Sequence, residues 1–467
     1  MILSPEVEEL IASLRREIVL LRAEVADLRR PLGQDSSTSS KPPSSDGLKK
    51  KPRVAGSLRD PSGKPGGGQR GHKGDTLRQV ADPDSIVRHE AWACRHCRAP
   101  LDPAMATGVE KRQVFDLIER PLRVSEHQAS IYRCARCRGM TRAGFPEAVT
   151  SPVQYGARLR AAAVYLNVQQ LIPEDRAAQA LVDLFGAPML CPASVATWVR
   201  RKARDLERVY RRIGERVGEA KVRHVDETGF RIAGRLQWLH TTSSQAFTFY
   251  RAGERRGAIP EDLRGGVVVH DHFIPYRRMQ GGVAHAFCNA HHLRELKGLI
   301  AFDNEAWAEP MRQVLLDANA AVRKARAAGA RALAPDAIEA FSERFWEAVR
   351  RGLAFHRQLP ALETKAGPRG RTRQRPGRNL LERLKTFKAE TLRFLTDFDV
   401  PFTNNLAEQD LRMMKVRMKI SGSFRTLAGA RDFGCLRSIV STARKQGCNI
   451  LHTLAADPVQ LIQALAN

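Results

Sequence analysis

The sequence predicts a multidomain α+β protein, because three kinds of segment follow one another along its 467 residues. Residues 221–290 contain short strand-like stretches, whereas the stretches before and after them have the periodicity of amphipathic helices. A small segment with two Cys-x-x-Cys pairs precedes both. At about 100 to 200 residues per domain, this length corresponds to roughly two to four domains.

The N-terminal segment, residues 1–30, is expected to form a coiled-coil helix. Its apolar residues are spaced alternately by four and three positions, as in a heptad seam: Val7, Ile11, Leu14, Ile18, Leu21, Val25 and Leu28. This spacing favours a homo-oligomer that associates through the helix. A helix that packs on its own protein is the alternative.

Residues 31–80 are rich in Ser, Pro, Gly and Lys and cannot bury a core, so we expect a flexible basic linker. The whole chain has 77 Lys and Arg against 50 Asp and Glu, a formal net charge of +27. An excess of this size favours a polyanionic partner, of which nucleic acid is the commonest. A merely basic surface, as in ribosomal proteins, is the alternative.

Residues 81–146 form the cysteine-bearing module. Cys94 and Cys97 make one knuckle, and Cys134 and Cys137 make a second. Two such pairs complete a tetrahedral sulfur shell, so the sequence predicts structural Zn²⁺. The stretch between the pairs, around 113–118 and 122–124, is expected to be a hairpin that brings the knuckles together. Two independent reduced thiol pairs are the alternative.

Residues 150–220 are helical by pattern. One helix is expected from Pro173 to a Gly186 terminator, and a second from about Pro192. The second helix carries basic residues at its end, as a helix-turn-helix DNA-binding region does: Arg200, Arg201 and Lys202. Two packed helices with a solvated basic end explain the pattern nearly as well.

Acidic residues end two of the strands expected in residues 221–296. The expected strands are 221–226, 236–242, 246–250 and 266–271, and Asp226 and Asp271 stand at two of their ends. Carboxylates from adjacent strands can share a divalent cation, and oxygen ligands suit Mg²⁺ or Mn²⁺. A lone acidic residue at a strand end is otherwise an ordinary surface residue.

Residues 297–400 return to helix, and residues 401–467 are a C-terminal helical part. Glu408 opens a helix there, with Asn404 or Asn405 as its expected cap. The basic residues that follow, including Arg412, Lys415 and Arg417, would neutralise phosphates or simply form a solvated face. Three carboxylates in the order strand, strand, helix meet the needs of phosphodiester displacement, which uses two metals roughly 4 Å apart.

Motifs along nearly the whole chain resemble the insertion sequence 66 family of bacterial DDE transposases. They are the leucine heptad, the Gly33-Gln-Asp-Ser-Ser-Thr-Ser-Ser-Lys-Pro-Pro run, the cysteine module, His224-Val-Asp-Glu-Thr, the segment 285–296, Asn404-Asn-Leu-Ala-Glu, and the segments 421–425 and 442–447.

The resemblance implies that Asp226, Asp271 and Glu408 form the DDE triad. It also implies a ribonuclease-H-like α/β core with a helical insertion at 297–400. The chain reads Asp271-His-Phe where many relatives read Asp-Gly-Tyr, which leaves Asp262 as an alternative second carboxylate.

Cys288, His291 and His292 lie close together in the sequence and suggest a further zinc site, but a fourth ligand is not obvious. The resemblance places His291 in the strand-to-helix segment after the second Asp. It therefore implies that His291 contacts DNA or the active site.

The function implied is metal-dependent cleavage and strand transfer at the terminal inverted repeats of a mobile element. The partners are then double-stranded DNA, both repeats and target, and accessory proteins of the same element. With no apolar run suited to a membrane or a signal peptide, we expect a cytoplasmic, nucleoid-associated protein. A catalytically inactive DNA-binding regulator and a stand-alone nuclease are the alternatives.

Overall fold

A mixed β-sheet carries the residues of interest. The computed structural model describes residues 78–116, 122–188, 190–258, 263–359 and 374–466, with isolated positions from Ser4 to Thr38. In these residues one sheet has the order β5-β4-β3-β6-β7. Its strands are β3 Val222–Ile232, β4 Arg235–Ser243, β5 Thr248–Gly253, β6 Val267–His270 and β7 Ala284–Phe287.

The directions of the strands follow from their connections. Tight turns join β3, β4 and β5, which pair antiparallel, whereas β6 pairs parallel to both β3 and β7. All four residues of β6 are buried, as expected of a central strand covered on both faces. The four expected strands are confirmed, and β7 is a strand that the sequence did not reveal.

The internal contacts of the chain divide it into two units, residues 50–125 and residues 1–49 with 126–467. The first unit contains the knuckle of Cys94 and Cys97 and a short 3-10 turn, η2 Pro103–Met105. The second contains a two-stranded hairpin, β1 Ile131–Arg133 and β2 Met140–Arg142, around the other cysteine pair. The expected hairpin between the cysteine pairs is wrong for its described residues, 113–116 and 122–124, which form no strand.

The helices before the sheet agree with the sequence pattern. They are α2 Ala157–Val164, η3 Tyr165–Gln169, α3 Glu174–Phe185, α4 Pro192–Asp205 and α5 Glu207–Glu219. Gly186 ends α3 with a left-handed φ of 68°, which explains why glycine stands there. On α5 the buried residues recur every four positions, at Val209, Ile213 and Val217, so one stripe faces the core.

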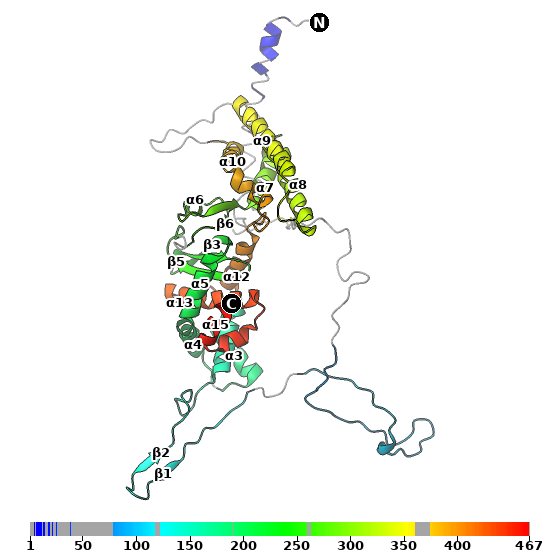
Figure 1. The fold of residues 1–467 in the computed structure, drawn as a ribbon, viewed down its shortest axis with the longest axis vertical. Coiled ribbons are helices and arrows are strands. Elements are labelled where there is room, and N and C mark those ends of the chain that lie inside the picture. Colours follow the sequence, from blue (N-terminus) through cyan, green and yellow to red (C-terminus); the bar gives the residue numbers. More distant parts are fainter. Residues whose placement is uncertain are drawn as a thin grey trace. The chain divides into compact units, whose positions relative to one another are not determined.

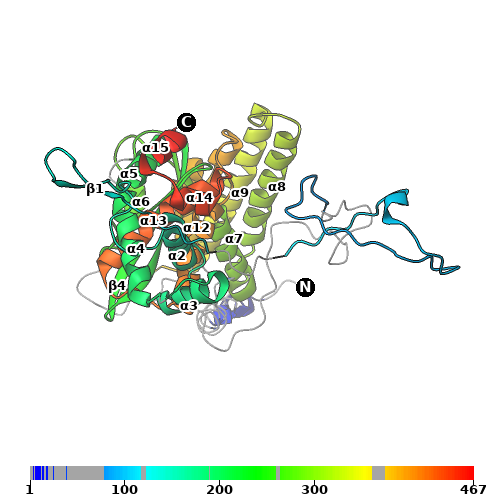
Figure 2. The same cartoon turned by 90° about the horizontal axis from the view of Figure 1, so that it is seen from below.

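The C-terminal helices share a core with these helices and with the sheet. They are α12 Asn405–Ile420, α13 Leu427–Lys445, α14 Ile450–Ala455 and α15 Pro458–Ala466. One hydrophobic cluster joins Val164, Ile213, Tyr250, Leu436 and Leu461. Figure 2 shows α2, α12, α13 and α14 gathered on one side of the molecule. Helices α2, α4 and α5 therefore share a hydrophobic core with the sheet, whereas α3 packs in a smaller cluster with Ala163 and Val195.

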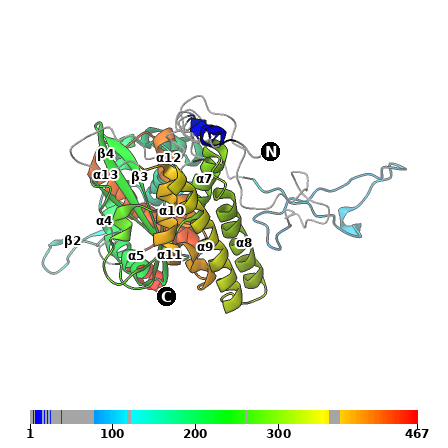
Figure 3. The same ribbon diagram turned by 90° about the horizontal axis from the view of Figure 1, so that it is seen from above.

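The segment between β7 and α12 is helical, as expected, and has its own core. It contains α7 Asn289–Gly298, η4 Leu299–Asp303, α8 Ala308–Ala327, α9 Pro335–Gln358, α10 Pro376–Thr386, α11 Lys388–Leu392 and η5 Arg393–Leu395. Side chains from these helices, including Met311, Phe345 and Leu381, form a second cluster. Figures 1 and 3 show α8, α9 and α10 side by side.

The N-terminal segment is described only in part, and its described residues 6–11, 13, 14, 17, 18, 21 and 25 are helical. Heptad residues Val7, Leu14, Ile18, Leu21 and Val25 are exposed there. Leu28 and nearly all of the linker lie outside the described residues. Among the helices that the structure describes, none combines the length and the apolar content needed to cross a bilayer.

Candidate active site

The sheet brings two of the three predicted carboxylates together. His224 on β3 is level with Val269 on the parallel strand β6. Asp226 lies two residues beyond His224, and Asp271 lies two residues beyond Val269, immediately after the end of β6. The two carboxylates are close enough for the charge of Asp271 to raise the pKa of Asp226. Asp262, the alternative to Asp271, lies outside the described residues.

Glu408 reaches the same place from the other side of the insertion. It lies in the first turn of α12, and α12 packs against β3 and β4. Its negative charge and that of Asp271 are close enough to raise the pKa of Asp226. The three carboxylates predicted from the sequence therefore lie near one another, although 137 positions separate the last two.

Burial and mutual repulsion hold these carboxyl groups away from their usual ionisation. Burial, followed by the charge of Glu227, raises the pKa of Asp271 to about 6. The pKa of Asp226 is raised well above its ordinary value, first by burial and then by Glu227, Asp271 and Glu408. Such a cluster favours either bound protons or a bound cation.

A fourth carboxylate, Glu227, is paired with Arg256 and Tyr276. Its side chain is 2% exposed and accepts a hydrogen bond from Arg256 Nε at 2.8 Å. The Tyr276 hydroxyl donates to its other oxygen at 2.5 Å. The Arg256 guanidinium also stacks 4.2 Å from the centre of the Phe273 ring. Glu227 is therefore a fixed charge beside the site.

The remaining three carboxylates lack such compensation. Within the described residues, no Lys, Arg or His forms an ion pair with Asp226, Asp271 or Glu408. Asp226 accepts a hydrogen bond from the Glu227 amide at 2.9 Å, and Asp271 accepts one from the Phe273 amide at 2.9 Å. An all-oxygen cluster with unbalanced negative charge fits a hard divalent cation.

Asn404 connects the strand of Asp226 to the helix of Glu408. It occupies the N-cap position of α12, but its side chain does not cap the helix. Its Nδ2 instead donates to the Val225 carbonyl at 2.8 Å, and its Oδ1 lies 3.0 Å from His224 Nδ1. Asn404 thus stands at the expected N-cap position, but its side chain bonds to β3 and not to the helix. It joins β3 to α12.

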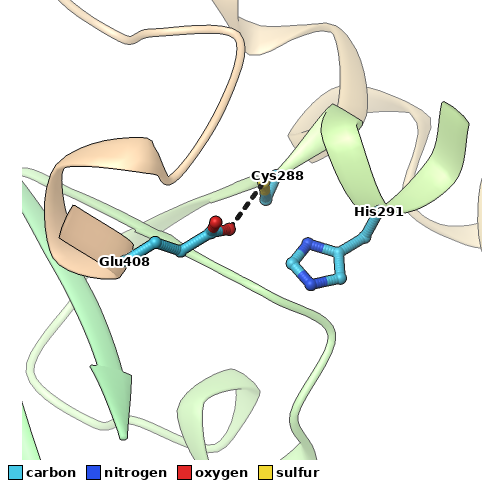
Figure 4. Close-up of side chains that lie close together, drawn as sticks. All are labelled: Cys288, His291 and Glu408. Carbon is cyan, nitrogen blue, oxygen red and sulfur yellow. Dashed lines mark hydrogen bonds between the residues drawn. The ribbon is translucent and has the colours of Figure 1, made fainter. Parts of the chain in front are cut away.

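Cys288 and His291 also lie close to Glu408. Cys288 Sγ is 3.9 Å from Glu408 Oε1 and accepts a hydrogen bond from the Asn404 amide at 3.2 Å. Figure 4 shows the His291 ring turned towards both side chains. His292 belongs elsewhere, because its Nδ1 lies 3.0 Å from Asn289 Oδ1 in a buried pair.

The predicted DNA contacts differ in their accessibility. Arg200, Arg201 and Arg412 are exposed, and Lys202 and Lys415 are half-buried. Arg417 is 6% exposed and stacks 4.5 Å from the centre of the Phe424 ring. The expected phosphate contact by Arg417 is therefore replaced by packing in this fold.

Each cysteine pair lies in a tight turn closed by backbone hydrogen bonds. The Cys94 amide donates to the Ala99 carbonyl, and the Cys134 amide donates to the Gly139 carbonyl. Hydrogen bonds from the backbone of the same turn, above all from Cys97 and Cys137, lower the pKa of the Cys94 and Cys134 thiols. The two pairs fall in different units, so a shared four-cysteine site stays a prediction.

Sequence reasoning missed several residues of the site. Glu227 follows Asp226 directly, but the pattern gave no sign that it is buried. Tyr276 and Arg256 carry no local signal, since only the fold brings them to Glu227. Asn404 was noticed, yet as a helix cap.

Comparison with known proteins supports the resemblance drawn from the motifs. A model of the Transposase IS66 family matches residues 152–432, more than half of the chain. A second model, of a family of unknown function (DUF6444), matches residues 2–78. No curated protein matches the sequence. The first match spans the helices before the sheet, all three candidate carboxylates and the insertion, and the chain belongs to the IS66 family of transposases.

Proposed function

We propose that Asp226, Asp271 and Glu408 are the catalytic triad of a transposase that cuts and joins DNA at the ends of an insertion sequence. The observation that carries the proposal is their convergence without an ion-pair partner among the described residues. The charges of Asp271 and Glu408 both raise the pKa of Asp226, and no described cation forms an ion pair with any of the three. A transposase acts on DNA, so the +27 net charge has a natural partner.

The sheet order supports the ribonuclease-H-like core that the family resemblance implies. Three antiparallel strands are followed by two parallel ones in the order β5-β4-β3-β6-β7. Asp226 stands on β3, and Asp271 directly follows the neighbouring strand β6. The glutamate follows on a helix after a separate helical insertion.

The three carboxylates would hold divalent cations such as Mg²⁺ or Mn²⁺, which activate the attacking oxygen and stabilise the leaving oxygen of a phosphodiester. The protein's own task is to fix the carboxylates. Asn404 ties α12 to β3, and Arg256 with Tyr276 holds Glu227 beside them. Water attacks at the element end, and the freed 3′-hydroxyl then attacks target DNA.

The test is cleavage and strand transfer by the full-length protein on DNA that carries the terminal inverted repeats of its element, with Mg²⁺ or Mn²⁺. Asp226→Asn, Asp271→Asn and Glu408→Gln should each lower cleavage by at least about 10²- to 10³-fold, because each removes stabilisation of the reacting charge. DNA binding in a gel-shift assay should persist.

Asp399→Asn is the matched control. Asp399 is an exposed carboxylate paired with Lys221 at 2.7 Å, and its loss should leave cleavage unchanged. Full cleavage by any of the three triad variants would refute the assignment of that residue. Cleavage without strand-transfer products would favour a nuclease, and wild-type DNA binding without cleavage would favour a regulator.

The remaining modules have proposed roles in assembly. The N-terminal heptad is proposed to join copies of the chain on the paired element ends. The knuckles are proposed to bind structural Zn²⁺, and Arg200, Arg201, Lys202, Arg412 and Lys415 to contact phosphates. His291 is considered separately below, because its position suggests a metal in place of DNA.

A further inference from the structure

A mixed-ligand cluster stands beside the proposed triad. The Cys288 sulfur, a ring nitrogen of His291 and a carboxylate oxygen of Glu408 all lie within 4.8 Å of one another. Figure 4 shows the three side chains converging from the end of β7, the first turn of α7 and the first turn of α12. The sequence offered Cys288 and His291 without a further ligand, and the fold supplies Glu408 from 120 positions away.

The local structure explains why the two sequence neighbours point the same way. Cys288 is the N-cap residue of α7, and His291 follows three positions later, on the same face of the first turn. The His291 amide donates to the Cys288 carbonyl at 3.1 Å, which closes the turn. The first turn of α7 is therefore sufficient to place Cys288 and His291 side by side.

One of the three groups, His291, has a polar atom that the described residues leave without a partner. His291 Nδ1 is buried and has no hydrogen-bond partner among the described residues. Cys288 is 1% exposed, and its contact with Glu408 is a long 3.9 Å. A buried ring nitrogen without a partner is costly, and a metal ion is one of the partners that would remove the cost.

We propose that Cys288, His291 and Glu408 bind a zinc ion through one sulfur, one nitrogen and one oxygen. Thiolate and imidazole select zinc over the hard cations Mg²⁺ and Mn²⁺, which prefer oxygen. Three protein ligands leave a fourth tetrahedral position open for water or a substrate oxygen.

The distances allow this site with little movement. With Zn–S of about 2.3 Å and Zn–N and Zn–O of about 2.0 to 2.2 Å, tetrahedral ligands lie roughly 3.3 to 3.6 Å apart. The three atoms, now within 4.8 Å, need to approach by about 1 Å. The thiolate and the carboxylate together balance the charge of Zn²⁺.

The surroundings support the ligands. The Asn404 amide donates to Cys288 Sγ at 3.2 Å, the kind of outer contact that orients a ligating thiolate. Two cationic side chains near His291, Arg294 and Arg383, would repel a metal ion. The charge of Arg383 is balanced by its ion pair with Glu295 at 2.5 Å.

This zinc site goes beyond the proposed function and shares with it only Glu408. A carboxylate has two oxygens, so Glu408 can serve both zinc on the Cys288 side and a hard cation on the Asp226 side. The zinc site does not depend on the triad being catalytic.

The test measures zinc in the full-length protein. Wild type, Cys288→Ser, His291→Asn and Glu408→Gln are equilibrated with Zn²⁺ alone, freed of loose metal, and analysed for zinc per chain by mass spectrometry. A Co²⁺ titration then reports thiolate ligation by the intensity of the sulfur-to-cobalt absorption band. Because the comparison is with wild type, any zinc at the Cys-x-x-Cys pairs cancels.

Cys288→Ser and His291→Asn should each bind one zinc fewer than wild type, and Glu408→Gln should bind it roughly a hundredfold more weakly. Cys435→Ser is the matched control, since Cys435 is also buried but lies on α13, and it should keep all zinc. Asp226→Asn should keep the zinc even when it abolishes cleavage, which separates this inference from the proposed function.

Equal zinc content and equal cobalt absorption in wild type, Cys288→Ser and His291→Asn would overturn the proposal. If Cys288→Ser does not fold by circular dichroism, His291→Asn decides alone, because His291 is only half-buried.

Discussion

Asp271 carries a charge that the folded protein accommodates poorly. Burial and Glu227 raise its pKa to about 6, above the ordinary value of 3.8. The folded state therefore holds the proton more tightly than the unfolded state does. The stability that this provides is complete below about pH 3.8 and is lost as the pH rises through about 6.

Replacing that carboxylate should stabilise the protein when no cation is present. In EDTA at pH 7.5, Asp271→Asn is expected to increase the free energy of unfolding by on the order of 1–2 kcal/mol, because it removes a half-buried charge. The gain should shrink towards pH 5, where wild type is largely protonated. Urea unfolding at both pH values measures it.

The exposed Asp399, paired with Lys221, provides the control, and Asp399→Asn should show no such gain. Adding Mn²⁺ should stabilise wild type and leave Asp271→Asn unchanged. A variant less stable than wild type at pH 7.5 in EDTA would contradict this account of Asp271.

At the scale of elements, Asn404 sets the position of α12 against β3. Asn404→Ala should lower the free energy of unfolding by roughly 2–4 kcal/mol, because it leaves the Val225 carbonyl and His224 buried without partners. It should also weaken Mn²⁺ binding, since Glu408 and Asp226 lose their connection. Thermal unfolding and calorimetric Mn²⁺ titration measure the two effects.

Its sequence neighbour is the natural comparison. Asn405 is exposed at the first position of α12, so Asn405→Ala should change neither quantity by much. Equal Mn²⁺ affinity in both variants would show that Asn404 does not position the carboxylates.

Two adjacent glycines before β6 offer a second test of how elements place the site. Both have a left-handed φ, 55° at Gly265 and 59° at Gly266. A Cβ on Gly266 would lie 2.7 Å from the Lys221 carbonyl, whereas a Cβ on Gly265 would meet nothing within 4 Å. Gly265→Ala should therefore lower the free energy of unfolding by about 1 kcal/mol, because alanine disfavours the left-handed backbone conformation.

Gly266→Ala should lower the free energy of unfolding by about 1–3 kcal/mol more than Gly265→Ala does, because the backbone of β6 must shift as well. Since Asp271 follows β6, Mn²⁺ affinity should fall in this variant and stay unchanged in Gly265→Ala. Urea unfolding and Mn²⁺ titration of the pair check both parts, and equal values for the two variants would contradict the role of the close approach.

The parts of the fold that the sequence revealed are those with local signals. Gly186 ended α3 where expected, and apolar runs located four strands of the sheet. β7 was missed because its four residues, Ala284–Phe287, are too short and too mixed for a periodic pattern. The expected hairpin did not form in its described residues, because Val114 and Phe115 have strand-like composition but are exposed, and strand propensity depends on burial against neighbours.

The candidate site was predictable where chemistry and position coincided. Asp226, Asp271 and Glu408 were found from their residue types and from motifs of the family. Glu227 and Tyr276 contact each other across 49 positions, a distance that no local pattern reports. Arg417 was misjudged because helical periodicity does not reveal which basic residue turns towards Phe424 and Phe433.

At the scale of the whole molecule, the N-terminal heptad is expected to set the number of copies that act together. Leu14→Lys combined with Leu21→Lys should reduce the oligomer to a smaller species, because charges at heptad positions cannot be buried between helices. Both residues are exposed in the single chain, at 48% and 54%. Light scattering after size-exclusion chromatography measures the mass.

Leu10 gives a control of the same chemistry. It is 59% exposed and lies off the heptad, so Leu10→Lys should leave the mass unchanged. A double variant with the wild-type mass would argue for a helix that packs on its own chain.

The hydrophobic cluster shared by α2, α4, α5, the sheet and α12–α15 limits how the chain can be dissected. A fragment that begins at β3 would keep Asp226, Asp271 and Glu408 but would expose the apolar faces that Val164 and Ile213 normally cover. These helices therefore cannot be replaced as an independent domain, as would be possible if a linker separated them from the sheet. If α4 contacts DNA as proposed, that contact is packed against the same core as Asp226 and Glu408, so a substitution that alters it would also have to preserve the packing of the proposed catalytic site.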